Sequence, residues 1–168
     1  MTIRHHFELR ETIATILADE ELVIETACEG IRTARYELER YIIQDPFFNS
    51  SFEPLTITQG PDIIKNMAAA AWKAGVGPMA AVAGAIAHAG VSAAQKKGAS
   101  FCIIDNGGDI AMITDRPVRV GLYAGNSPLS GKYAFFIPPK NEIYGICTSS
   151  ATVGHSFSFG TADSVTVF

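Results

Sequence analysis

The sequence predicts a single α+β domain in which antiparallel strands pack against helices rich in alanine and glycine. Three stretches lead to this prediction. Apolar residues recur at helical spacing over residues 20–44, as expected of one long amphipathic helix. An unusually small-residue helix is predicted over 79–97, and a strand–turn–strand pattern with Asn-Gly-Gly at its turn follows over 101–114. With 168 residues, of which 48% are hydrophobic, the chain is long enough to bury one core.

Charge and composition argue against several classes of function. The formal net charge is −4 and the sequence contains no basic stripe, so we expect no nucleic-acid partner. Residues 67–94 carry few charges, but Gly75–Pro78 divides them, and neither half has the ~20 strongly apolar residues of a membrane span. The three cysteines form no CxxC pair, which argues against a structural zinc site. An odd cysteine count without a secretion signal predicts a cytoplasmic protein.

The N-terminal residues are predicted to form strands followed by the long helix. Alternating apolar residues over 6–18 predict one strand, or two strands with a break near Glu11–Thr12. We expect Asp19 to cap the helix, because its side chain can accept a hydrogen bond from a free amide. The helix should end at Gln44, since the residue before Pro46 avoids helical geometry.

The middle of the chain is predicted to be mostly helical. Residues 47–60 should form a loop with a short strand at 55–58, and a proline then precedes a helix over 62–74. Pro78 suits the first position of the small-residue helix, and Gly98 should end that helix in the left-handed conformation. The small side chains let another helix or a flat ligand approach the backbone closely.

The C-terminal third is predicted to consist of strands. After the hairpin, strands are expected at 118–124, 132–137, 143–148 and 164–168. The polar run 149–160 is also predicted to be a strand, because His155, Phe157 and Phe159 alternate with serines and would form one aromatic face.

The turn from Asn106 to Asp109 is the first candidate site. Gly107 and Gly108 would let a ligand reach the backbone, while Asn106 and Asp109 would offer an amide and a carboxylate to a hydroxyl group or a metal. The same residues also have a simpler interpretation, because Asn-Gly is the preferred turn of a two-residue hairpin. The local sequence leaves both interpretations open.

The segment Gly75–Pro78 is the second candidate site. Backbone amides near Gly77, at the start of a helix, could bind a phosphate with the help of the helix dipole. However, the segment lacks the Gly-Lys-Ser/Thr of a P-loop. It is also typical of a plain turn between two helices.

Cys147 is the third candidate. A thiolate activated by His155, eight residues later, could act as a nucleophile or carry a persulfide. A cysteine after an apolar strand is more often a small buried hydrophobic residue. Ser149 or Ser150 together with His155 and Asp163 are the ingredients of a serine hydrolase, but the GxSxG elbow is absent.

Five segments taken together resemble one known family. In chain order they are GVGPMAAVAGAIA, DNGGDIA, YAGNSPLSG, GICTSSATVGHSFSFG and ADSVTV. They resemble an uncharacterised family of prokaryotic proteins related to ApbE, the FAD:protein FMN transferases, over residues 7–168. Relative to the transferases, Gly84 matches a helix motif, but Ala83 stands where a lysine is expected and His88 where an aspartate is expected.

The resemblance implies an ApbE-like fold that binds FAD or another nucleotide in a cleft near the hairpin. Backbone groups near Gly77 and Gly108 would admit the ligand, Asp109 would bind ribityl or ribose hydroxyls, and the segment from Thr148 would contact phosphate. The catalytic residues expected from the sequence itself, apart from the resemblance, are Cys147 and His155. The cofactor-binding residues would be Gly77, Asn106, Gly107, Gly108, Asp109, Thr148, Ser149 and Ser150.

The resemblance also implies limits and an alternative. The uncharacterised family and the transferases both normally continue past the last strand into a helix with an Ala-Asp-x-x-Ala-Thr motif. In the transferases this motif supplies magnesium ligands. This sequence stops at Phe168, so we expect no metal site here, and magnesium only in a longer chain. The family is associated with sulfur assimilation and homocysteine formation, so the alternative is a cytoplasmic factor or carrier acting through Cys147. The Ala/Gly-rich helix faces leave a homo-oligomer open.

Overall fold

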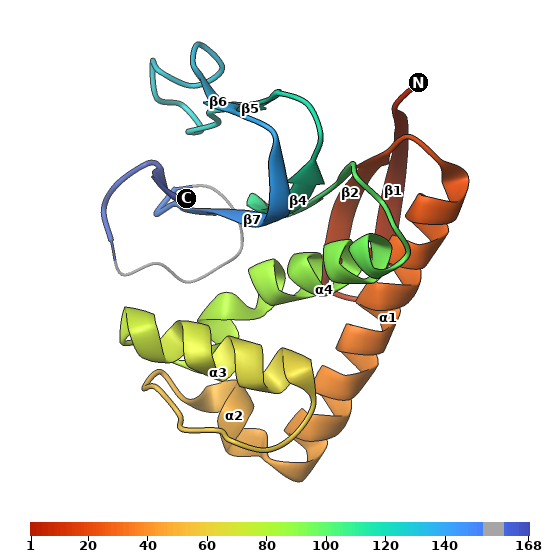
Figure 1. The fold of residues 1–168 in the computed structure, drawn as a ribbon. Coiled ribbons are helices and arrows are strands. Elements are labelled where there is room, and N and C mark those ends of the chain that lie inside the picture. The colour runs from red at the N-terminus through yellow and green to blue at the C-terminus, as the bar shows by residue number, and fades with distance from the viewer. Residues whose placement is uncertain (153–159) are drawn as a thin grey trace.

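A six-stranded antiparallel sheet forms the centre of the computed structural model, which describes residues 1–152 and 160–168 (Figure 1). The strand order is β1-β2-β3-β4-β7-β8, so β4 pairs directly with β7. Among the described residues, strands β5 and β6 pair only with each other and form a separate hairpin. The strands are β1 Ile3–Leu9, β2 Thr12–Ala18, β3 Cys102–Asn106, β4 Asp109–Thr114, β5 Val118–Gly121, β6 Ala134–Ile137, β7 Lys140–Ser149 and β8 Val165–Val167.

The helices lie on one side of this sheet (Figure 1). A 3-10 turn, η1, leads directly into α4, and a short helix, α2, follows the long α1. The helical elements are α1 Glu21–Gln44, α2 Pro46–Ser50, α3 Asp62–Ala74, η1 Pro78–Ala81 and α4 Val82–Lys96. The predicted α+β class is therefore confirmed, with antiparallel strands against Ala/Gly-rich helices.

Strand alternation gives the sheet two different faces. On β2, Ala14, Ile16 and Ala18 are buried and belong to the main core with α1 and α4. On the opposite face, Ile103 and Ile146 belong to a second, smaller core under the β5–β6 hairpin. The sheet thus separates a helical layer from a hairpin layer.

The small residues of α4 serve mainly to bring α1 close. A Cβ atom added to Gly30 of α1 would lie 2.7 Å from the Ala93 Cβ and 2.9 Å from the Ala89 carbonyl oxygen. A Cβ on Gly90 would lie 3.1 Å from the Ala27 carbonyl oxygen. Of the two partners that the sequence allowed for this helix, another helix or a flat ligand, the structure supplies the helix.

Several predicted boundaries hold, and several are wrong. The break between β1 and β2, the end of α1 at Gln44 and the left-handed Gly98 are confirmed. Asp19 does not cap α1, because its carboxylate binds Arg116 and Thr2 instead, and Glu20 occupies the cap position.

The predicted loop after α1 is also partly wrong. Residues 46–50 form α2, since Pro46 suits a first helical turn. The expected strand at 55–58 does not form, because no neighbouring strand pairs with it. The predicted strand with the aromatic face of His155, Phe157 and Phe159 lies largely outside the described residues.

The membrane test gives a limited result. Over the described ranges, no single helix is both long enough and apolar enough to cross a bilayer. The pair formed by α3 and Pro78–Lys96 meets the length and composition test together, but it is bent by 106°.

Candidate functional site

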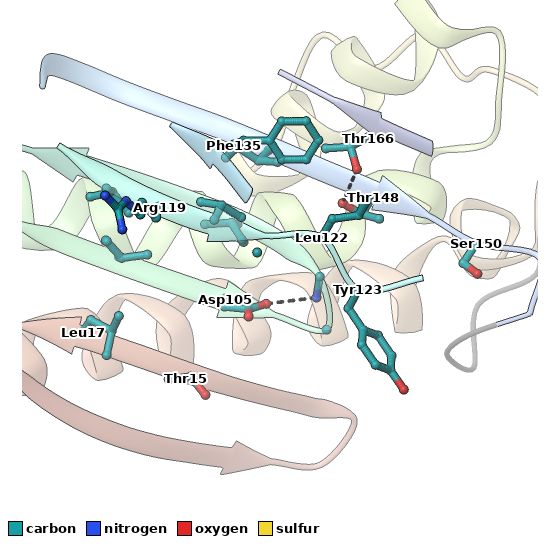
Figure 2. A pocket seen from close by; sticks show the side chains of 18 of the residues that line it. Thr15, Leu17, Asp105, Arg119, Leu122, Tyr123, Phe135, Thr148, Ser150 and Thr166 are labelled. Atoms are coloured by element: carbon teal, nitrogen blue, oxygen red, sulfur yellow. Dashed lines mark hydrogen bonds between the residues drawn. The ribbon is translucent and has the colours of Figure 1, made fainter. Parts of the chain in front are cut away.

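A cavity of about 500 Å³ lies between the sheet and the β5–β6 hairpin. Its floor is the face of the main sheet that the helices do not cover, and β5 with the residues after it forms the opposite wall (Figure 2). Its lining residues are Arg4, Thr15, Leu17, Ile103, Asp105, Gly107, Gly108, Ile110, Val118, Arg119, Val120, Gly121, Leu122, Tyr123, Phe135, Ile146, Thr148, Ser150 and Thr166.

One end of the cavity is polar and is formed by the predicted turn. Gly107 and Gly108 are its two central residues, with φ angles of 68° and 96°, which glycine adopts without strain. The amide of Gly108 donates a hydrogen bond of 3.0 Å to the Asp105 carboxylate, which holds the turn (Figure 2). The hydroxyl groups of Thr148 and Thr166 lie 3.1 Å apart beside it.

Two arginines of the cavity stand out by their lack of partners. Arg4 comes from β1 and Arg119 from β5, and both line the cavity. Among the described residues, neither has an ion pair or an aromatic ring beneath it, whereas the other five arginines each do. Those pairs are Arg10–Glu39, Arg35–Glu11, Arg116–Asp19, Arg32–Phe7 and Arg40–Tyr36.

Strand alternation divides the predicted site between the two faces of the sheet. Thr148 points to the cavity, so its neighbour Cys147 points to the helices. Asp109 and Asn106 also face the helices, and the Asn106 amide donates a hydrogen bond of 3.0 Å to the Ala83 carbonyl of α4. The candidate residues therefore form two groups with the sheet between them.

Asp109 is the centre of the group on the helix side. Its carboxylate accepts a hydrogen bond of 3.3 Å from the Thr148 amide. Burial raises the pKa of this carboxyl, while hydrogen bonds from Thr148, Cys147 and Gly84 oppose the rise. The net direction is upward, so the surroundings disfavour the charged form.

Cys147 lies against the same carboxylate and near the start of α4. A Cβ added to Gly84 would lie 3.6 Å from the Cys147 Sγ and 4.0 Å from an Asp109 oxygen. Cys147 is exposed at the surface, yet partial desolvation of its thiol, followed by the charge and hydrogen bond of Asp109, raises the pKa of Cys147 to about 11. Nucleophilic cysteines need the opposite shift, so these surroundings do not favour the predicted catalytic role.

The model of a family described as AbpE bacteria matches residues 2–168. The chain belongs to this family. The expected relation to the ApbE transferases is suggested by that description alone.

Several similar proteins match nearly the whole chain. The chain is 99% identical over 168 residues to a UPF0280 protein of Methanospirillum hungatei, spanning all of this chain and 69% of that protein. It is 63% identical over 166 residues to a UPF0280 protein of Methanosphaerula palustris, covering 99% of this chain and 70% of the relative. A UPF0280 protein of Methanoculleus marisnigri is 60% identical over 166 residues, which cover 99% of this chain and 68% of that protein.

Two more predicted site residues, in addition to Asn106, Asp109 and Cys147 on the helix side, do not line the cavity. Gly77 packs against the backbone of Ser51 and Phe52, where a side chain would overlap the Ser51 carbonyl. Ser149 pairs with Val165 of β8 and does not line the cavity. His155 lies outside the described residues, so its predicted role stays a prediction.

Sequence reasoning missed Arg4, Arg119 and the aromatic residues of the hairpin layer. No local pattern indicates them, because each belongs to a short strand with ordinary alternation. Strand alternation alone could have shown one part of the arrangement. Ile146 and Thr148 share one face of a strand, so Cys147 between them must lie on the other face. Within residues 1–152 and 160–168, no group of three or more His, Cys, Asp or Glu could hold a metal ion.

Proposed function

We propose that this protein binds a flavin or a related nucleotide in the cavity between the sheet and the β5–β6 hairpin. The single observation that carries the proposal is the cavity itself, which combines apolar walls, a glycine turn and, away from that turn, two arginines without a partner among the described residues. A volume of about 500 Å³ lies within the ~300–1,000 Å³ range of small-molecule sites.

The apolar part of the cavity fits a flat aromatic ring. Leu17 and Ile110 come from the sheet, while Val120 and Phe135 come from the hairpin opposite. A ring between these two layers would exchange water for apolar contacts on both of its faces. Ligand sites typically combine such walls with a few polar groups that fix orientation.

The polar groups of the cavity fit phosphate and sugar groups, with the arginines at one place and the glycine turn with its threonines at another. Arg4 and Arg119 can each form a charge-assisted hydrogen bond with a phosphate, which is stronger than a neutral one. The hydroxyls of Thr148 and Thr166, beside the Gly107–Gly108 turn, can bind ribityl or ribose oxygens. Both features support a phosphorylated ligand over a purely apolar one.

Calorimetric titration of the purified chain tests this proposal. We expect FMN and FAD to bind at micromolar concentration in the absence of magnesium. Arg4→Gln and Arg119→Gln should each weaken FMN binding about 10- to 100-fold, because a hydrogen bond to a charged group contributes ~1.5–3 kcal/mol. Riboflavin, which has no phosphate, should bind these variants and the unaltered chain equally.

Arg40→Gln is the matched control, because it removes the same charge at a position that lies over Tyr36 and outside the cavity. Its FMN affinity should stay unchanged. An absence of heat with FMN, FAD and riboflavin would overturn the proposal. The alternative of a sulfur carrier acting through Cys147 has no observation in its favour, since the pKa of that thiol is raised to about 11.

A further inference from the structure

The inner edge of β5 is a second feature of the cavity, distinct from its side chains. β5 pairs with β6 on one edge and with no strand on the other among the described residues. Every residue from 118 to 123 lines the cavity. A strand face would contribute alternate residues only, so this continuous lining indicates that the backbone edge of β5 borders the cavity.

The hydrogen-bond phase of the hairpin shows which backbone groups point to that edge. The Leu122 amide donates a hydrogen bond of 2.9 Å to the Tyr133 carbonyl. In an antiparallel pair the backbone groups alternate between the two edges, so Val120 also pairs with β6. The amide and carbonyl groups of Arg119 and Gly121 therefore point away from β6.

We propose that the Arg119 carbonyl and the Gly121 amide bind the donor–acceptor edge of a flavin ring. This inference rests on the proposed function and names the part of the ligand that forms hydrogen bonds with β5. The two groups flank Val120 on the same edge, so they offer one acceptor beside one donor. The pyrimidine part of a flavin has the complementary pattern, an N3–H beside a carbonyl.

The energetics of the free edge support this pairing. A backbone amide or carbonyl that loses its water and gains no hydrogen-bond partner raises the free energy of the complex. A purely apolar ring at the free edge of β5 would therefore bind more weakly. A ring whose N3–H donates to the Arg119 carbonyl, and whose adjacent oxygen accepts from the Gly121 amide, satisfies both groups. The neighbouring apolar residues Ile110 and Phe135 remain available to the faces of that ring.

Gly121 allows this edge to be altered cleanly. A Cβ atom added there would meet no heavy atom within 4 Å, so Gly121→Ala keeps the amide without a clash. Gly121→Pro removes the amide, and proline is tolerated at an edge strand where the amide has no ladder partner. The two variants therefore form a matched pair that differs in one donor.

The experiment compares riboflavin with N3-methylriboflavin, by titration of the unaltered chain and both variants. We expect N3-methylriboflavin to bind the unaltered chain at least tenfold more weakly than riboflavin. Gly121→Pro should weaken riboflavin binding to a similar extent, while Gly121→Ala, which keeps the amide, should weaken it less than Gly121→Pro does. Circular dichroism spectra of the variants confirm that they are folded.

The outcomes separate the two proposals. Equal binding of riboflavin and N3-methylriboflavin would overturn the edge inference and leave flavin binding intact. No riboflavin binding by the unaltered chain would overturn both. If Gly121→Pro does not fold, the two ligands on the unaltered chain decide the result.

Discussion

Replacing Gly77 with alanine separates a structural role from the cofactor-binding role that the sequence predicts. The backbone at Gly77 has φ −69° and ψ 153°, which any residue adopts, so alanine causes no backbone strain. It would even stabilise the fold by ~0.4–1 kcal/mol through the unfolded state. The side chain, however, would overlap the Ser51 carbonyl oxygen and lie 2.8 Å from its carbon.

The magnitude follows from the displacement that this overlap requires. Ordinary contact begins at about 3.4 Å, so the Ser51 carbon must move by at least about 0.6 Å and its oxygen by more. Overpacking of this kind costs ~1–3 kcal/mol. The net effect is a loss of ~1–2 kcal/mol, which at ~2–4 °C per kcal/mol for a chain of this size lowers Tm by ~2–8 °C.

Thermal unfolding followed by circular dichroism measures this change, with Gly121→Ala as the control that has open space for its Cβ. The folded Gly77→Ala variant should bind FMN as the unaltered chain does, because Gly77 does not line the cavity. An unchanged Tm together with lost FMN binding would refute this reasoning and restore the ligand role of Gly77.

Three further predictions concern the helix side of the sheet. Burial raises the pKa of the Asp109 carboxyl above its unfolded value, so the folded state keeps its proton to higher pH. The free energy of unfolding should therefore fall as pH rises through the interval between the two pKa values. Urea denaturation across pH 4–8 should show this fall for the unaltered chain and not for Asp109→Asn. Because its pKa is raised to about 11, Cys147 should react slowly with iodoacetamide at pH 7 and about tenfold faster for each pH unit above 7. Asp109→Asn should speed this reaction. Mass spectrometry measures the rate, and a rate that stops rising near pH 7 would contradict the prediction. Asn106→Ala removes the hydrogen bond to the Ala83 carbonyl, which keeps its bond within α4, and should cost ~0.5–1.5 kcal/mol of unfolding free energy. Denaturant titration can check this value, and an unchanged midpoint would exclude it.

The sequence predicted the local elements well where one residue decides them. Pro46 ends α1, Gly98 ends the α4 segment in the left-handed conformation, and the Gly107–Gly108 pair sets the central hairpin. Asp19 failed as a cap because Arg116, almost a hundred residues later, takes its carboxylate. A partner so distant in sequence leaves no local signal.

The arrangement of the candidate residues was predicted less well, because it depends on tertiary packing. The sequence correctly brought the Gly107–Gly108 turn near Thr148 and Ser150. It also grouped Cys147 with them, although adjacent residues of one strand face opposite sides of a sheet. Arg4 could be recognised as unpartnered only after the other arginines had found their carboxylates and rings in the folded chain.

The direct pairing of β4 with β7 has a consequence for how the cavity can change in this family. The β5–β6 hairpin is inserted between two strands that are already neighbours, and its ladder is independent of theirs. Substitutions within 118–137 therefore leave the hydrogen bonds of the main sheet intact. One wall of the cavity can diversify among relatives while the scaffold built from α1, α4 and the central strands stays constant.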